Sequence, residues 1–184
     1  LLIILLFAAN FAWAQYTNVR IDSGSSSPNE PSIWINPKNP NQVVGGANIN
    51  SYYYSTNGGT NWTKAALTST YSVWGDPAIF TDTLGNFYYL HLTNPSGGTF
   101  IDRIVCQKST NGGANWNNGS YMGFNVPKQQ DKAWGCVDPR NNNLYVTWTQ
   151  FDSYGSSSPS DSSNILFSRS TDGGNNWSTA LRIN

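Results

Sequence analysis

The chain has 184 residues, enough for one ordinary domain, and its basic and acidic residues balance to a formal net charge of zero. Only 11% of the residues are charged, and the composition has no excess of positive charge that would favour binding to nucleic acid or to an anionic membrane surface. Aromatic residues make up 14% of the chain, which excludes a disordered protein and favours short strands joined by tight turns.

The N-terminus has the features of a processing signal. Residues 1–9 form an apolar run that is too short to span a bilayer, and Ala12-Trp13-Ala14 places small residues at the two positions that a signal peptidase reads. We therefore expect a signal peptide over residues 1–14, truncated because it has neither an initiator Met nor a basic segment, and a secreted domain over residues 15–184 with no membrane span. A buried strand or helix is the alternative interpretation of the apolar run.

Three similar repeats follow in chain order. Each has an acidic residue, three runs rich in β-branched and aromatic residues, a tight-turn motif and a fourth short run. The first three runs are predicted at 30–35, 42–47 and 51–55, then 76–80, 86–92 and 101–109, then 131–137, 144–150 and 165–170. Four short strands per repeat are typical of a propeller blade, and a solenoid of stacked β-units is the alternative.

The turn motif recurs three times with the pattern S-x-[DN]-x-G-x-x-W, which we call the box. Asn or Asp followed by Gly-Gly favours a tight turn, in which the side-chain oxygen accepts backbone N–H bonds and glycine takes positive φ. The tryptophan is expected to fold back and to bury its ring under the hairpin. Calcium binding by these turns is the alternative, although they lack the acidic ligands of an EF-hand loop. The box residues are Ser55, Asn57, Gly59 and Trp62, then Ser109, Asn111, Gly113 and Trp116, then Ser170, Asp172, Gly174 and Trp177.

On these residues the chain resembles the sialidase-like superfamily of BNR-repeat proteins, whose signature is the Asp-box. The resemblance implies an all-β fold, a β-propeller of four-stranded antiparallel blades with Asp-box hairpins. About three blades, near residues 30–66, 76–126 and 131–184, would be present of about six or seven in a closed ring, with further domains possible beyond them. Two boxes carry Asn where the family prefers Asp. The box predicts a fold and leaves the reaction open.

Blade topology indicates where a ligand could bind. Successive turns alternate between two ends of a blade, so the boxes should lie opposite the residues that open each first strand, and first strands line the central channel. Glu30, Asp76 and Asp131 are therefore the candidate catalytic residues at one channel mouth. Trp34, Trp74 and Trp134 are the candidate ligand-binding rings. The alternative is structural: acids that lock neighbouring blades, and tryptophans that pack between them.

The remaining chemistry-bearing residues give weaker indications. His91 lies in an apolar run and is interpreted as a packed strand histidine rather than a catalyst. Cys106 and Cys136 fall in neighbouring repeats, and the sequence leaves open whether they form a disulfide. We expect no metal site and no cofactor.

The sequence favours a secreted glycoside hydrolase that acts on an extracellular glycan or glycoconjugate. Family sialidases use a Tyr–Glu pair, an Asp acid and three arginines, the first in an R-I-P motif. Arg20-Ile21-Asp22 lacks that proline, which puts sialidase activity in doubt. A non-catalytic propeller that binds carbohydrate or protein, and a structural or adhesive module of a larger exported protein, remain the alternatives.

Overall fold

The computed structural model describes residues 17–24, 27–97 and 100–184, so the predicted signal peptide over residues 1–14 lies outside the described residues. Within the described ranges the chain contains strands, turns and bends but no α-helix. Twelve strands form three antiparallel sheets of four, which confirms the all-β class.

The strands follow the chain order within each sheet. Sheet 1 contains β1 (Ser32–Ile35), β2 (Val43–Ala47), β3 (Ser51–Ser55) and β4 (Thr63–Ala66). Sheet 2 contains β5 (Gly75–Thr81), β6 (Phe87–Thr93), β7 (Arg103–Ser109) and β8 (Ser120–Met122). Sheet 3 contains β9 (Gln129–Val137), β10 (Leu144–Phe151), β11 (Ser163–Ser170) and β12 (Leu181–Arg182). The predicted runs agree with these bounds to within about two residues at most ends, because the period-2 patterns and turn residues that define them are local.

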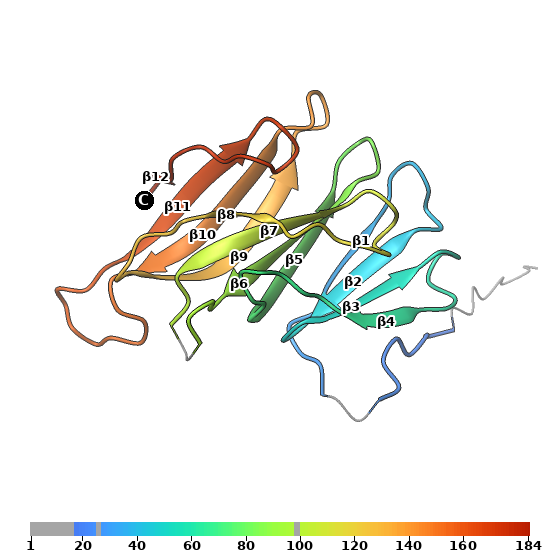
Figure 1. Cartoon of the computed structure of the whole chain (residues 1–184), viewed down its shortest axis with the longest axis horizontal. Coiled ribbons are helices and arrows are strands. Elements are labelled where there is room, and N and C mark those ends of the chain that lie inside the picture. The colour runs from blue at the N-terminus through green and yellow to red at the C-terminus, as the bar shows by residue number, and fades with distance from the viewer. Residues whose placement is uncertain (1–16, 25–26, 98–99) are drawn as a thin grey trace, which may run out of the picture.

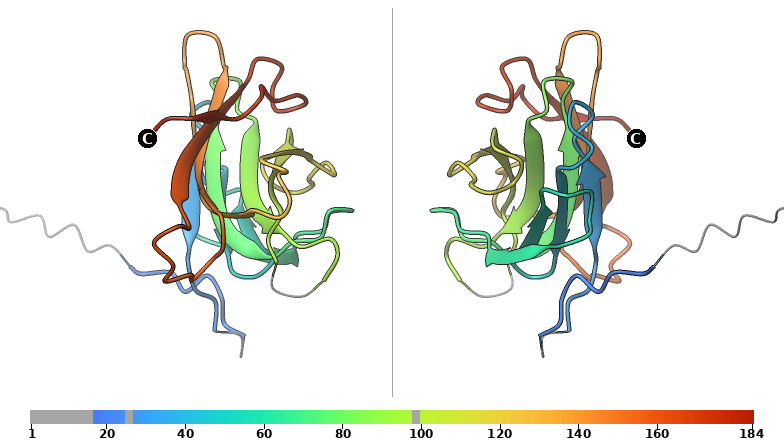
Figure 2. Two further views of the ribbon diagram at one scale, coloured as in Figure 1. Left: turned by 90° about the vertical axis from the view of Figure 1, so that its left-hand side faces the viewer. Right: turned by 90° about the vertical axis from the view of Figure 1, so that its right-hand side faces the viewer.

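The three sheets stand in a row in Figure 1, and the side views of Figure 2 show them one behind another. The first strands are neighbours across the sheets, since β5 contacts both β1 and β9. The fourth strands β4, β8 and β12 form the opposite edge. This is the arrangement expected where first strands surround an axis.

Two apolar layers hold the sheets together. The layer between sheets 1 and 2 includes Val44, Phe87 and Tyr89, and the layer between sheets 2 and 3 includes Leu90 and Trp148. Every residue of β6 is buried, because alternate side chains enter the two layers. In β10, buried and half-buried residues alternate instead, since only one face of sheet 3 packs on sheet 2.

Glycines let aromatic side chains of sheet 2 fit into both neighbouring sheets. A Cβ on Gly46 would lie 2.6 Å from the Tyr89 hydroxyl oxygen, and a Cβ on Gly135 would lie 2.3 Å from Phe80 Cε1. Both rings are at most 1% exposed, so they have no room to move away. Each interface of sheet 2 therefore depends on a residue without a side chain in the opposing sheet.

Each box forms the tight turn between the third and fourth strands of its sheet, as the sequence predicts. In all three, the serine Oγ accepts the backbone N–H of the second glycine at 2.9 Å. The Asn or Asp Oδ1 accepts the N–H four residues later, at 2.9 Å for Asn57 and Asn111 and 3.0 Å for Asp172. The conserved geometry across Asn and Asp follows from the oxygen that both side chains supply.

The box tryptophans are half-buried rather than fully buried, which corrects the prediction. The Trp116 and Trp177 rings pack on the face of their sheet that points toward the preceding sheet. Trp116 lies edge-on to Tyr52 and Tyr89, with centroids 6.0 and 5.5 Å away, and Trp177 Nε1 donates to Ser120 Oγ of sheet 2 at 2.8 Å. These rings lie at the edge of the layers between sheets, which leaves part of each ring in contact with solvent.

The two cysteines are free thiols on opposite sides of sheet 3. Cys106 is 2% exposed between sheets 2 and 3, and burial raises its pKa to about 12. Cys136 is exposed on β9 and pairs with Tyr145 on the face of sheet 3 that points away from sheet 2. The two residues therefore occupy different environments.

Candidate functional site

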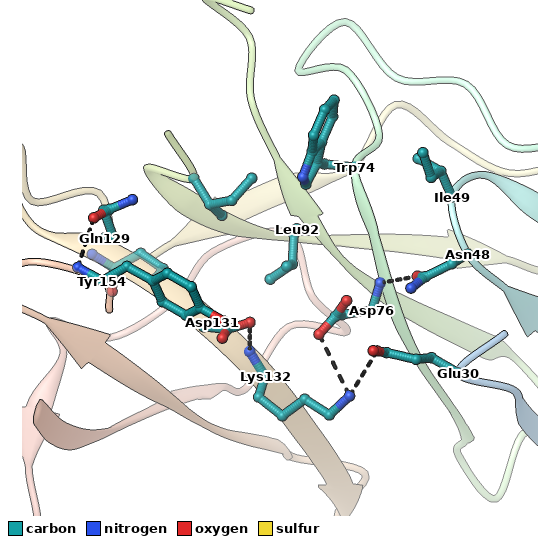
Figure 3. A pocket seen from close by; sticks show the side chains of 12 residues that line it. Glu30, Asn48, Ile49, Trp74, Asp76, Leu92, Gln129, Asp131, Lys132 and Tyr154 are labelled. Atoms are coloured by element: carbon teal, nitrogen blue, oxygen red, sulfur yellow. Dashed lines mark hydrogen bonds and ion pairs between the residues drawn. The ribbon is translucent and has the colours of Figure 1, made fainter. Parts of the chain in front are cut away.

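A cavity of about 470 Å³ opens where the first strands begin, at the end of the sheets opposite the boxes (Figure 3). All three predicted acids line it. The turns after the second strands and the long loop after β10 supply further residues, which the alternation of turns along each sheet predicts. The lining residues are Glu30, Asn48, Ile49, Trp74, Asp76, Leu92, Ile101, Gln129, Gln130, Asp131, Lys132 and Tyr154.

Each of the three repeats places one side chain at an equivalent position of this cavity, just before or within its first strand, and the third of these side chains is a lysine. Glu30, Asp76 and Lys132 share a φ of 50°, a backbone conformation that L side chains rarely adopt. Asp76 and Lys132 lie at matching breaks in the ladders of β5 and β9. The sequence prediction matched Asp131 to Glu30 and Asp76. Asp131 lines the cavity, but Lys132 is the structural equivalent, because the ladder break falls one residue later than the acidic pattern suggests.

The lysine bridges the two acids. Lys132 Nζ lies 2.8 Å from Glu30 Oε2 and 3.5 Å from Asp76 Oδ2, so one ammonium joins residues of all three sheets (Figure 3). The Lys132 side chain is 61% exposed and that of Asp76 is 18% exposed. The network therefore runs from solvent into the partly buried floor of the cavity.

The surroundings of the three carboxyls shift their pKa values in different directions. The hydrogen bond from Lys132 lowers the pKa of Glu30. Burial raises the pKa of Asp76, and the negative charge of Glu30 raises it further. Burial also raises the pKa of Asp131, whose Oδ1 accepts the Lys132 backbone N–H at 2.8 Å. The site therefore combines one carboxylate that stays ionised with two carboxyls that hold protons more readily than usual.

Asn48, which sequence reasoning missed, fixes the position of Asp76. Its Oδ1 accepts the Asp76 backbone N–H at 2.6 Å. The preceding Gly75 has a φ of 112°, and a Cβ there would lie 2.4 Å from the same oxygen. Only glycine allows this approach. Asn48 follows β2 in an ordinary turn sequence, so no sequence pattern connects it to Asp76 across 28 positions.

Of the three predicted tryptophans, Trp74 alone lines the cavity. Trp34 and Trp134 lie further along the first strands and are 47% and 68% exposed outside it, because each side chain points to the face of its sheet rather than to the strand opening. Tyr154, from the loop after β10, supplies a second ring. Its N–H donates to Gln129 Oε1 at 2.8 Å, and its ring lies edge-on to Phe151. Tyr154 lies on a loop 23 residues after Asp131, the nearest of the three predicted acids, and no motif in the sequence singles out its ring.

His91 lies away from this cavity. His91 is fully buried in β6, as predicted, and its Nδ1 lies 2.8 Å from the Leu92 carbonyl oxygen. The part of the chain that the structure describes holds no cluster of three or more metal-ligating side chains and no helix long and apolar enough to cross a bilayer.

Comparison with known protein families finds no matching family model, and comparison with curated proteins finds no matching sequence. Solved structures do match. A protein of unknown function from Dyadobacter fermentans matches with a TM-score of 0.65 and 12% identity, over 88% of this chain and 52% of that one. An α-L-arabinanase from Penicillium chrysogenum, solved with arabinobiose, matches with a TM-score of 0.60 and 13% identity, over 83% of this chain and 48% of that one.

A Hadza microbial sialidase matches with a TM-score of 0.50 and 14% identity, over 77% of this chain and 33% of that one. A polysaccharide lyase with the same type of fold also matches. The chain spans about half the length of the first two matched structures. At these identities the likeness concerns the fold: the three sheets have the architecture of propeller-type enzymes that act on glycans.

Proposed function

We propose that the cavity is the active site of a glycoside hydrolase that cleaves an extracellular glycan. One observation carries the proposal: Glu30 and Asp76 share a lysine, while their surroundings move their pKa values in opposite directions. Such divergence separates an acid from a base or nucleophile in glycosidases. The fold shared with arabinanases and a sialidase supports the proposal.

In this proposal Asp76 is the general acid that protonates the leaving-group oxygen. Glu30 is the ionised partner. Both carboxyls contact the same nitrogen at 2.8 and 3.5 Å, so their contacting oxygens are separated by at most about 6 Å, the sum of those distances. This upper limit lies below the roughly 6.5–9.5 Å of inverting enzymes, in which the wider gap admits a water molecule. We therefore assign Glu30 as the nucleophile. Asp131 is the alternative acid, because its pKa is also raised.

The test is hydrolysis of a panel of glycosides by the full-length protein. Asp76→Asn keeps the shape of the side chain but removes the proton donor, and we expect a loss of about 100-fold or more in rate. The matched control is Asn57→Ala in the first box, at the opposite end of sheet 1, which should keep the rate. Because the acid must be protonated, the rate should fall as the pH rises through the pKa of Asp76. Activity that survives Asp76→Asn rules out this acid.

The second candidate is a propeller that binds a glycan without cleaving it. The observation that favours it is the ion network itself, because Lys132 joins the three sheets as a structural lock would. Glycan binding without product formation, together with a lower melting temperature in Asp76→Asn, would support this function. A structural or adhesive module predicts neither binding nor cleavage of any glycan in the panel.

We also propose that the protein acts outside the cell and that further blades complete the ring. The small residues at Ala12 and Ala14 support export. The half-exposed outer face of sheet 3, which includes Tyr145 and Phe167, supports the docking of another blade. Mass spectrometry of the secreted protein, with its mature N-terminus and total length, tests both.

A further inference from the structure

We propose that the cavity selects uncharged glycans and rejects acidic sugars, and that Glu30 determines this selection by occupying the lysine that would otherwise bind a sugar carboxylate. The inference rests on the proposed function only in that a glycan binds in this cavity. It does not depend on cleavage.

The first step is the balance of charge in the cavity. Three of its lining residues are acidic, and Lys132 is the single cation among the lining residues. Even with Asp76 protonated, as the proposed acid must be, the carboxyls of Glu30 and Asp131 outnumber the ammonium of Lys132, so the cavity offers a sugar carboxylate no excess of positive charge. Like charges at close range in a partly buried site repel strongly, because the effective dielectric constant is far below that of water.

The second step concerns Lys132. Its ammonium lies 2.8 Å from Glu30 and 3.5 Å from Asp76. Figure 3 shows the Lys132 side chain extended toward these two carboxyls. A carboxylate ligand would have to displace Glu30 or share the ammonium with both acids. Lys132 therefore neutralises the protein's own carboxylates and leaves little positive charge for a ligand.

The third step is the position of the arginines, the usual bidentate partners of carboxylates. Among the described residues, no arginine lines the cavity. Arg103 makes two bonds of 2.8 Å to Asp102 and lies 4.2 Å from the Phe124 ring centre. Arg140 makes two bonds of 2.9 Å to Asp138. The guanidinium groups of Arg103 and Arg140 are therefore paired elsewhere, and the remaining arginines also lie outside the cavity lining, namely Arg20, Arg169 and Arg182.

The rest of the lining suits a neutral sugar. Trp74 and Tyr154 present rings that are 41% and 61% exposed, and Asn48 and Gln129 add amide groups. Flat rings pack against the C–H faces of a sugar, and amides exchange hydrogen bonds with hydroxyls without a net charge. The only charged sugar substituent that this lining favours would be positive.

The test is calorimetric binding of three neutral disaccharides, arabinobiose, lactose and cellobiose, against two acidic sugars, digalacturonate of the same size and the larger 3′-sialyllactose. For the wild-type protein we expect a neutral sugar to bind at least tenfold more tightly than any acidic one. In Glu30→Gln, Lys132 loses its closest partner, and the affinity ratio of acidic to neutral sugars should rise at least tenfold. Asp138→Asn removes the same charge at the box end of sheet 3 and should leave the ratio unchanged.

Tighter binding of an acidic sugar by the wild-type protein overturns the inference, and so does an unchanged ratio in a folded Glu30→Gln variant. If that variant unfolds, the comparison of neutral and acidic sugars in the wild-type protein tests the inference by itself. Neutral binding without hydrolysis contradicts the hydrolase but supports the selection. Preferential acidic binding leaves the glycan site standing and contradicts the selection. Absence of all glycan binding contradicts both.

Discussion

His91 is the single histidine of the chain, and it has no contact with solvent. Its ring lies edge-on to Tyr89 within the layer between sheets 1 and 2. Burial lowers its pKa to about 4 from the ordinary value of 6.5. The imidazole is therefore neutral at every pH at which the protein is expected to work, and it belongs to the core rather than to catalysis.

This neutral histidine makes the stability of the fold depend on pH. Between pH 6.5 and pH 4 the unfolded chain binds a proton that the folded chain does not, so the free energy of unfolding falls as the pH falls through this window. The shift corresponds to about 3 kcal/mol. Urea unfolding at several pH values should give a steeper pH dependence for the wild-type protein than for His91→Gln. Equal slopes in the two proteins would show that His91 titrates normally.

At the scale of the element, the box tryptophan joins one sheet to the preceding one. Trp116 packs against two tyrosine rings of sheets 1 and 2, whereas Trp62 lies on the face of sheet 1 that points away from sheet 2. We expect Trp116→Ala to lower the free energy of unfolding by about 3 kcal/mol, because both ring contacts are lost. Trp62→Ala should cost less. Thermal unfolding measures both, and equal losses would show that the contact between sheets contributes nothing.

The sequence predicts the strands and turns well. It predicts less well which residue of each repeat occupies the equivalent position in the cavity. The boxes, the strands and the gathering of Glu30, Asp76 and Asp131 at one end follow from local turn chemistry and from period-2 patterns. The positive φ that selects Lys132 does not, because backbone conformation at a ladder break has no fixed residue signature. Asn48 and Tyr154 come from loops, whose positions depend on tertiary packing rather than on local pattern.

At the scale of the whole molecule, the sheets interlock through glycines. Gly135 faces the fully buried Phe80 ring, so Gly135→Ala should force the ring or the strand to shift and should cost about 1–3 kcal/mol. Phe80→Leu in the same protein should recover part of the loss, because a smaller side chain leaves room for the methyl group. A melting temperature unchanged by Gly135→Ala would contradict this tight packing.

The shared φ of Glu30, Asp76 and Lys132 has an evolutionary consequence. Glycine adopts this backbone at no steric cost, whereas a side chain there costs on the order of 1 kcal/mol. Mutation under selection for stability alone would drift toward glycine at these three positions. Persistence of charged side chains requires a selective benefit that outweighs the strain. A relative with glycine at all three would keep the three sheets without this strain, and it would lack the ion pairs that Lys132 makes with Glu30 and Asp76.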